Sequence, residues 1–317
     1  MRKNDSIFIA GGQSGLVGSA IVRSLQSKGY KNVIIRSRKE VNLLNAVQVE
    51  AFFRKEKPEY VFLAAAKVGG ILANSTQKAD FIYDNIQIQT NVIYWAWKAK
   101  IKKLLFLGSS CIYPRLAKQP IKERYFMTGP LEPTNDAYAI AKISGIKMCQ
   151  SFNDQYKTNF ISVMPTNLYG PNDNFDLINS HVLPAMIRKF HEAKIAHSKA
   201  VILWGDGSPR REFLYVDDLA DACVYLMEHY NSSEIINIGY GSDQTIRTLA
   251  EMVKKIVRYS GEIRWDTGKP NGTPRKQLDV TKLFRLGWRP KVKLVDGIRT
   301  EYEWYLTHEK EILHAKR

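Results

Sequence analysis

The segment Ser6-Ile-Phe-Ile-Ala10, followed after one residue by Gly12-Gln-Ser-Gly15-Leu-Val-Gly18, decides the fold of this chain. A short apolar run that enters a glycine turn and then a helical pattern over residues 16–28 predicts a strand, a turn and a helix. Glycine suits this turn because the backbone needs positive φ and must approach a pyrophosphate, which the free N–H groups of the helix N-terminus bind. The predicted dinucleotide contacts are Gly12, Gln13, Ser14, Gly15, Leu16, Val17 and Gly18.

The first half of the chain repeats this alternation of strand and helix. Apolar runs at 33–35, 60–63, 104–107 and 160–164 are separated by helical patterns at 46–55, 79–100 and 135–156. Crossover helices between short apolar strands predict an α/β fold with a doubly wound, Rossmann-type parallel sheet.

After residue 171 the pattern loosens into shorter elements at 201–204, 235–238 and 248–259. We expect a cofactor-binding domain at 1–171 and a smaller C-terminal α/β lobe at 172–317 that binds the substrate. Part of 205–240, near 213–216, is expected to return to the first sheet.

Composition indicates an ordinary globular protein. The 317 residues are 44% hydrophobic and carry a formal net charge of +16, with Lys and Arg spread along the chain. Without a dense basic run, this charge suits a phosphate-rich small ligand better than nucleic acid. No apolar stretch is long enough for a membrane span or a signal core, so we expect a cytoplasmic protein. Cys111, Cys149 and Cys223 lack the spacing of a metal site or a disulfide framework.

The second predicted strand ends in Ile35-Arg36-Ser37-Arg38. An NAD enzyme usually presents an acidic residue there to the ribose hydroxyl, whereas arginine accommodates a 2′-phosphate. The sequence therefore predicts NADPH as the cofactor, with Arg38 as the preferred contact and Arg36 as the reserve.

The fourth predicted strand leads into Gly108-Ser-Ser-Cys-Ile-Tyr-Pro114, and Tyr138 and Lys142 follow at helical spacing. Residues four apart share one helix face, where an ammonium is expected to lower the pKa of a phenol towards the range useful for proton transfer. The hydroxyl of Ser109 or Ser110 could donate a second hydrogen bond to the same carbonyl oxygen. The pattern predicts a carbonyl-reducing site.

Together these features resemble the extended short-chain dehydrogenase/reductase family, whose members bind NAD(P) and rework nucleotide sugars with a Ser, Tyr and Lys triad. The resemblance covers nearly the whole chain and is strongest to members that act on GDP-linked keto-deoxy sugars. It implies epimerisation of GDP-4-keto-6-deoxy-D-mannose at C3 and C5, hydride transfer from NADPH to C4, and a homodimer packed through the helices at 79–100 and 135–156. The segments that carry it are Leu63-Ala-Ala-Ala-Lys-Val-Gly-Gly70, Leu107-Gly-Ser-Ser-Cys-Ile-Tyr-Pro114, Leu131-Glu-Pro-Thr134, Ser162-Val-Met-Pro-Thr-Asn-Leu-Tyr-Gly-Pro171 and Gly272-Thr-Pro-Arg-Lys276.

The resemblance also implies a role for each catalytic residue. A C4 ketone acidifies the protons on both neighbouring carbons, so inverting them needs a base on one face of the ring and an acid on the other. Cys111 matches the family's base, which a nearby cationic cofactor site or His181 would have to activate. His181 matches the partner acid. In the reduction, Tyr138 would protonate the C4 oxygen, Lys142 would hold the nicotinamide ribose, and Ser109 would orient the carbonyl.

Further binding residues follow from the same resemblance. Cations can pair with a diphosphate and an indole can pack against a planar ligand. The implied cofactor contacts are Leu107, Gly108, Ser109, Ser110, Lys142, Pro165, Thr166, Asn167, Leu168 and His181. The implied substrate contacts are Lys189, Trp204, Arg211 and Lys276, with Arg275 in reserve.

Two positions depart from the family pattern. Gln13 and Ser14 stand where members commonly carry His-Arg, so one expected cation for the 2′-phosphate is missing and NADH stays an alternative cofactor. His191, by its helical spacing, is expected at the surface.

Two other functions remain open. A nucleotide-sugar 4-epimerase or dehydratase would carry the same triad but return its hydride to the substrate, consuming no NADPH. A dinucleotide sensor or nucleic-acid-binding protein on this fold would show no turnover, and the latter a steep salt dependence of binding. The added pair Cys111 and His181 favours the epimerising reductase.

Overall fold

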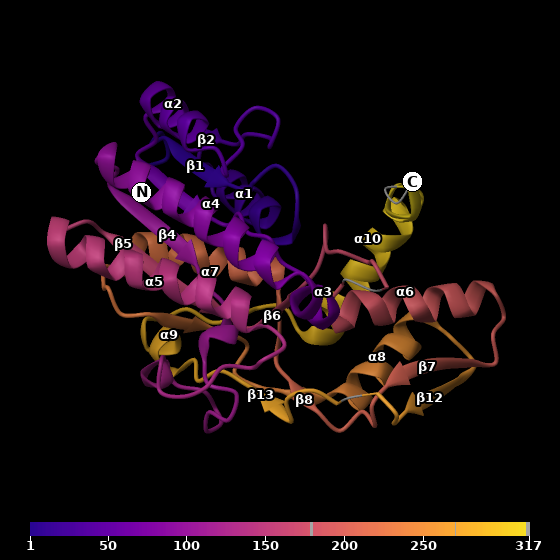
Figure 1. Cartoon of the computed structure of the whole chain (residues 1–317). Helices are drawn as coiled ribbons and strands as arrows, with labels where there is room; N and C mark the ends of the chain where they lie inside the picture. The colour runs from indigo at the N-terminus through magenta and orange to yellow at the C-terminus, as the bar shows by residue number, and fades with distance from the viewer. Residues whose placement is uncertain (178–179, 270, 315–317) are drawn as a thin grey trace.

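In the computed structural model, which describes residues 1–177, 180–269 and 271–314, six strands form the main sheet (Figure 1). Their order is β10-β5-β4-β3-β1-β2, and every neighbouring pair is parallel. The predicted doubly wound fold is confirmed. The strands are β1 (Ile7–Ala10), β2 (Val33–Ile34), β3 (Tyr60–Leu63), β4 (Lys103–Leu107), β5 (Phe160–Pro165) and β10 (Ile236–Ile238).

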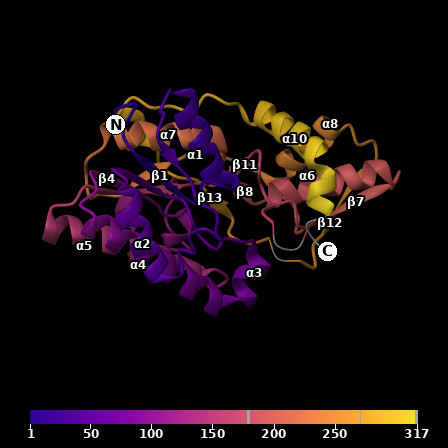
Figure 2. The ribbon, with the colours of Figure 1, turned by 90° about the horizontal axis from the view of Figure 1, so that it is seen from above.

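Helices cover both faces of this sheet, as the view from above shows (Figure 2). Side chains alternate along β1, so Ile7 and Ile9 join one core while Phe8 and Ala10 join the other. Because both faces are buried, the strand is apolar at every position. The first core is closed by α1 (Leu16–Ser27) and α7 (Val216–His229), and the second by α2 (Ala46–Glu56), α4 (Lys78–Lys98) and α5 (Asp136–Tyr156).

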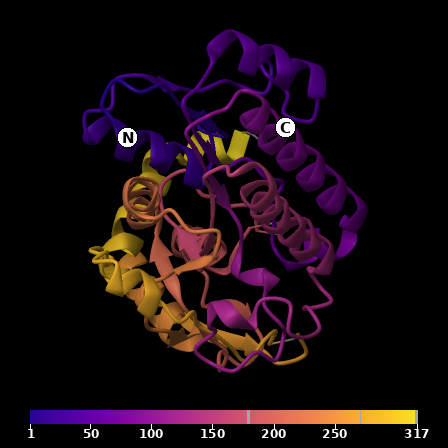
Figure 3. The same cartoon turned by 90° about the vertical axis from the view of Figure 1, so that its left-hand side faces the viewer.

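A third core forms the smaller lobe. It is built by α6 (Val182–Ile195), α8 (Ile246–Val257) and α10 (Leu294–His314) around the parallel pair β7 (Ala200–Trp204) and β12 (Glu262–Asp266). Figure 3 shows the orange and yellow C-terminal segments curving along the side opposite the purple and magenta helices. A small sheet joins β11 (Gln244–Thr245), β8 (Arg210–Arg211) and β13 (Arg275–Lys276), and the short helices are α3 (Ile71–Thr76), α9 (Thr281–Arg285), η1 (Ser110–Ile112) and η2 (Glu123–Tyr125).

Part of 205–240 returns to the main sheet, as β10, but the predicted element near 213–216 does not. The chain near 213–216 forms β9 (Phe213–Tyr215), which pairs in parallel with β6 (Asn167–Tyr169), whereas β10 is the strand that pairs with β5. Leu214 joins the first core while Phe213 and Tyr215 join the third. A strand between two cores has the same alternation whichever neighbour it pairs with, so its sequence could not identify the partner.

His191 is also placed differently from the prediction. Its side chain is buried, with Nδ1 3.0 Å from the Tyr302 hydroxyl and Nε2 3.1 Å from Glu309 Oε1. The surface prediction was wrong because α10, more than a hundred residues later in the chain, supplies both partners. Within the ranges described, no helix has the length and apolar character required to cross a membrane.

Two carboxyl groups meet where α10 approaches the loop that follows β6. Glu301 is 0% exposed, and among the described residues only the backbone N–H of Gly170 opposes the effect of burial on its carboxyl group. Burial raises the pKa of Glu301 well above its ordinary value, and the charge of Asp173 raises it further. Burial also raises the pKa of Asp173, to about 7. The folded state therefore favours the protonated form of both groups.

This pair makes stability depend on pH. The ordinary pKa values, 3.8 for Asp and 4.5 for Glu, apply to the unfolded chain, so the folded state binds more protons above them and the free energy of unfolding falls as pH rises towards 8. Glu301→Gln removes one buried acid and should stabilise the protein by about 1–3 kcal/mol at pH 8.

Thermal melts from pH 5 to pH 8 measure this effect, and the advantage of Glu301→Gln should shrink as the pH falls. Glu303→Gln, an exposed position on the same helix, is the control and should follow the wild type throughout. Equal melting temperatures of Glu301→Gln and wild type at pH 8 would contradict the prediction.

Candidate functional site

The glycine turn leaves the N-terminus of α1 open. Gly15 is the N-cap residue, with φ of +91° and no side-chain cap, and a Cβ there would meet no heavy atom within 4 Å. Gly18 is crowded instead, because a Cβ would lie 1.9 Å from the Gly11 carbonyl oxygen. Uncapped helical N–H groups facing open space fit the pyrophosphate of a dinucleotide. Gln13 and Ser14 are exposed at the same turn and add no charge.

The two predicted arginines differ in availability. Arg36 pairs with Glu56 Oε1 at 2.8 Å and also donates to the Ile35 carbonyl oxygen at 2.7 Å. Arg38 is exposed and makes no hydrogen bond or ion pair with any residue that the structure describes. Arg38 is therefore the arginine free to bind a phosphate.

The end of β4 and the first turns of α5 bring the predicted reducing residues together. The Tyr138 hydroxyl is hydrogen-bonded with Ser109, whose Oγ also accepts the Cys111 N–H at 3.2 Å. Lys142 Nζ donates to the Leu107 carbonyl oxygen at 2.8 Å and lies 5.8 Å from the centroid of the Tyr138 ring. Of the two candidate serines, Ser109 is thus the one at the phenol, and Ser110 is buried.

The pKa values of the Tyr138 and Lys142 pair correct the prediction. Burial raises the pKa of Tyr138, the charge of Cys111 adds to the rise, and the hydrogen bond with Ser109 opposes it. Burial lowers the pKa of Lys142 to about 7. The expected lowering of the Tyr138 pKa by Lys142 was wrong, because the ammonium lies against a carbonyl oxygen and both groups lose water. Tyr138 keeps its proton, which is the form that can protonate a carbonyl oxygen.

Side chains from distant segments meet at the sulfur of Cys111. Asn135 Nδ2 lies 3.3 Å and Lys276 Nζ 3.4 Å from Cys111 Sγ. All three residues line a cavity of about 50 Å³. We expected Lys276 at the substrate phosphates and assigned no role to Asn135, whose position at the start of α5 resembles that of a capping residue. A cation at this distance stabilises a thiolate.

His181 is the other proposed catalytic residue that Lys276 affects. It is the N-cap residue of α6 and keeps exposed surface. Protein atoms nevertheless crowd its imidazole, so burial lowers the pKa of His181, and the charge of Lys276 lowers it further. Lys276 therefore lies 3.4 Å from the sulfur of Cys111 and also acts electrostatically on His181. Within the described ranges, no cluster of three or more His, Cys, Asp or Glu residues could hold a metal ion.

The remaining predicted cofactor residues lie at the ends of β4 and β5. Gly108 allows the close approach of these strands, because a Cβ there would lie 2.5 Å from Met164 Cε. Thr166 Oγ1 and Asn167 Nδ2 donate to the Glu212 carbonyl oxygen at 3.3 and 2.7 Å. Their side chains thus hold the turn between β5 and β6, flanked by buried Pro165 and half-buried Leu168. No sequence signal had pointed to Glu212.

The predicted substrate residues of the smaller lobe are cations without acidic partners and an exposed indole. Arg211 donates to the Arg210 carbonyl oxygen at 2.8 Å. Burial lowers the pKa of Lys189 and that of Arg211, and neither side chain meets a carboxylate within residues 1–177, 180–269 and 271–314. Trp204 is 59% exposed, with Lys269 Nζ 5.7 Å from its ring.

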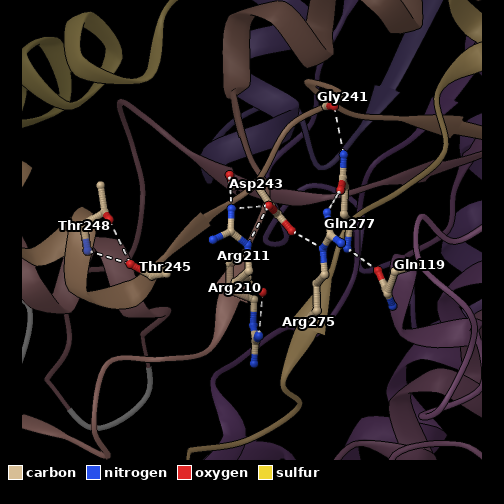
Figure 4. A network of polar contacts seen from close by, with 9 residues as sticks. All are labelled: Gln119, Arg210, Arg211, Gly241, Asp243, Thr245, Thr248, Arg275 and Gln277. Carbon is tan, nitrogen blue, oxygen red and sulfur yellow. Dashed lines mark hydrogen bonds and ion pairs between the residues drawn. The ribbon is translucent and has the colours of Figure 1, made fainter.

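Arg275, the additional candidate for substrate binding, is part of a neighbouring network of hydrogen bonds and ion pairs (Figure 4). Asp243 lies between two guanidinium groups, accepting from Arg275 Nε at 2.5 Å and from Arg210 at 2.7 and 2.9 Å. Arg275 also donates to Gln277 Oε1 at 2.6 Å. Asp243 thus neutralises Arg210 and Arg275, which lie opposite each other on β8 and β13, and leaves Arg211 as the unpaired guanidinium of the small sheet.

Known proteins with the same organisation are similar to this chain over almost its full length. Residues 7–239 match the NAD dependent epimerase/dehydratase family. GDP-L-fucose synthase 1 of Arabidopsis thaliana is 59% identical over 304 residues, 96% of this chain and 94% of the relative. A GDP-6-OMe-4-keto-L-xylo-heptose reductase from C. jejuni superimposes with a TM-score of 0.93 at 41% identity, over 97% of this chain and 99% of that one.

A GDP-L-fucose synthetase from Naegleria fowleri, solved bound to NADP, superimposes with a TM-score of 0.91 at 28% identity, over 98% of this chain and 96% of that one. The glycine turn, the parallel sheet and the grouping of Ser109, Tyr138 and Lys142 agree with these similarities. The chain belongs to the NAD dependent epimerase/dehydratase family.

Proposed function

We propose that this chain epimerises GDP-4-keto-6-deoxy-D-mannose at C3 and C5 and then reduces C4 with NADPH, giving GDP-L-fucose. The relative from Arabidopsis thaliana carries the name of this activity, and the Naegleria fowleri structure was solved with NADP. In this proposal residues 1–171 bind the cofactor, together with part of 205–240, and residues 172–317 mainly bind the substrate.

One observation carries the proposal: a thiol and an imidazole share one cation beside a carbonyl-reducing group. Lys276 Nζ lies 3.4 Å from Cys111 Sγ, and its charge lowers the pKa of His181. Cys111 follows Ser109 by two residues, at the end of β4 where Tyr138 also lies. A 4-epimerase that only moves a hydride has no need of this second acid and base.

Epimerisation uses Cys111 and His181. The Cys111 thiolate, stabilised by Lys276, removes a proton from a carbon next to the C4 ketone, and the electron pair moves into the enolate. The imidazolium of His181, made a stronger acid by its lowered pKa, returns a proton to the opposite face. Cys111 then releases its proton to solvent and His181 takes one up, and the same exchange at the second carbon completes the inversion.

Reduction uses Tyr138, Ser109 and Lys142. NADPH, when bound at the glycine turn, supplies the hydride that reduces C4. Tyr138, whose raised pKa keeps it protonated, gives its proton to the C4 oxygen, and Ser109 donates a hydrogen bond to the same oxygen. Lys142, with a pKa lowered to about 7, is poised to return a proton to Tyr138.

The smaller lobe holds the GDP group. Lys189 and Arg211 have partly lost water without gaining a carboxylate, so a diphosphate would restore their favourable interactions. The exposed Trp204 offers a planar surface to the base.

Two measurements separate the two reactions. With GDP-4-keto-6-deoxy-D-mannose in D₂O and no NADPH, the wild type should introduce deuterium at C3 and C5, and Cys111→Ser should slow this exchange about a hundredfold or more. Tyr138→Phe should keep the exchange but lose NADPH oxidation, because only the reduction needs the phenol. Absorbance of NADPH, mass spectrometry and sugar analysis give the readouts.

Cys149→Ala is the control, since Cys149 is fully buried in α5 away from the thiol in question, and it should retain both reactions. A wild type that remodels the sugar without consuming NADPH would establish the 4-epimerase. Absence of any reaction would refute catalysis on this substrate.

The cofactor preference should depend on Arg38. Arg38→Ala removes the unpaired cation and should lower the ratio of kcat/KM for NADPH over NADH about tenfold. Arg36→Ala should have a smaller effect, because Arg36 already pairs with Glu56. Ser14→Arg should raise the ratio by adding a cation at the turn.

Lys31→Ala, an exposed cation that precedes β2, is the control and should leave the NADPH to NADH ratio unchanged. A ratio that falls in Arg36→Ala but not in Arg38→Ala would place the 2′-phosphate at Arg36.

A homodimer packed through α4 and α5 is part of the proposal. Apolar side chains stand exposed on these two helices, among them Tyr83 at 65%, Ile140 at 45% and Tyr94 at 38%. Sheltering them would remove apolar surface from water.

Tyr83→Glu combined with Ile140→Glu should halve the mass measured by light scattering, because it places charges in the proposed interface. Val47→Glu, on α2 and 74% exposed, should leave the mass unchanged. A wild-type protein that is monomeric would contradict the dimer.

A further inference from the structure

A buried carboxylate joins the two halves of the molecule behind the candidate site. Glu212, between β8 and β9, is 0% exposed. Its Oε1 accepts the Gly241 N–H at 2.7 Å and its Oε2 accepts the Leu278 N–H at 2.9 Å. Gly241 follows β10 of the main sheet, whereas Leu278 follows β13 of the small sheet. One side chain therefore bonds to segments from both sheets.

The backbone of Glu212 holds two more segments of the site. Its N–H donates to the Lys276 carbonyl oxygen at 3.3 Å, and its carbonyl oxygen accepts Asn167 Nδ2 at 2.7 Å. Glu212 thus holds the segment that carries Lys276 at two points. Its N–H binds the carbonyl oxygen of Lys276, and its carboxylate binds the N–H of Leu278, two residues further along. A side chain anchored at both points of its strand can reach only a narrow region, and here Nζ reaches Cys111 Sγ.

The surroundings leave space for the carboxylate and little else. A Cβ on Gly239 would lie 2.4 Å from Glu212 Oε1 and 2.9 Å from Cδ, so any side chain at 239 would displace the group. Burial raises the pKa of Glu212, and its bonds to the backbone N–H groups oppose that rise. These bonds therefore determine where the group sits.

We propose that Glu212 is a positioning residue of the reaction, whose buried carboxylate holds Leu278 and Gly241 so that Lys276 lies against the sulfur of Cys111. The inference rests on the role given above to Lys276 beside Cys111. Glu212 acts through Lys276 and is not proposed to contact substrate or cofactor.

The reactivity of Cys111 towards iodoacetamide tests this inference without any substrate. Thiolates react and thiols do not, and Cys149 and Cys223 are 0% exposed, so alkylation of the folded chain reports on Cys111. This alkylation assay needs no GDP-sugar. If the enzyme failed to oxidise NADPH, the proposed function would be refuted, but the positioning role of Glu212 would still be decided by the alkylation rates.

Glu212→Gln places an amide NH₂ group opposite the N–H of either Gly241 or Leu278, so one of these two hydrogen bonds is lost. Loss of one hydrogen bond should slow the alkylation of Cys111 about five- to tenfold. Lys276→Met should slow it by a similar or larger factor. The double variant should be no slower than Lys276→Met, because the two residues act through one contact. Gly239→Ala keeps the carboxylate but displaces it, and should also slow the reaction.

Asp218→Asn is the matched control. Asp218 is likewise buried and accepts two backbone N–H groups, from Lys291 at 3.0 Å and Val292 at 2.9 Å, but makes no contact with Lys276. It should lower the melting temperature and leave the alkylation rate unchanged.

Three results would overturn the inference: wild-type alkylation in Glu212→Gln, wild-type alkylation in Lys276→Met, or additive effects in the double variant. If Glu212→Gln does not fold, Gly239→Ala decides alone, and a wild-type rate in that variant would refute the positioning role.

Discussion

Burial of the main sheet on both faces is the constraint on which the rest of the molecule depends. Strands such as β1 are apolar and buried along their whole length, and a buried polar side chain such as Lys103 at the start of β4 is tolerated because its Nζ donates to backbone carbonyl oxygens. Chemistry is therefore confined to the carboxyl ends of the strands, where the chain turns outwards. The glycine turn follows β1, Ser109 and Cys111 follow β4, and Thr166 and Asn167 follow β5. The smaller lobe then adds the cations Lys189 and Arg211, which have no carboxylate partner, and the exposed indole of Trp204.

Features encoded within one short segment could be predicted from the sequence. The helices at 46–55 and 135–156 begin and end within one residue of α2 and α5, because each combines a periodic apolar face with clear ends. The glycine turn is equally local, since its conformation and its close packing constrain the same few positions. Tyr138 and Lys142 share a helix face by spacing alone, so their proximity was also predictable.

Features that depend on distant partners could not be predicted. Lys276 reaches Cys111 from 165 positions further along the chain, and the cationic segment that carries it matched a phosphate site equally well. Glu212 looked like one more charged residue beside two arginines, because its bonds run to backbone groups that have no sequence signature. The pKa of Tyr138 depends on burial, which spacing along a helix does not reveal. The predictions for His191 and for the element near 213–216 were wrong for the same reason. His191 is buried by partners on α10, and β9 pairs with β6 rather than with the main sheet.

The small sheet has a consequence for synthesis of the chain on the ribosome. Its strands come from residues 210–211, 244–245 and 275–276, so β13 arrives only when most of the polypeptide has emerged. Domains generally fold from the N-terminus during translation. The glycine turn can therefore exist on a nascent chain before Cys111 has a cation beside it. The contact between Lys276 and Cys111 is thus among the last parts of the candidate site to form.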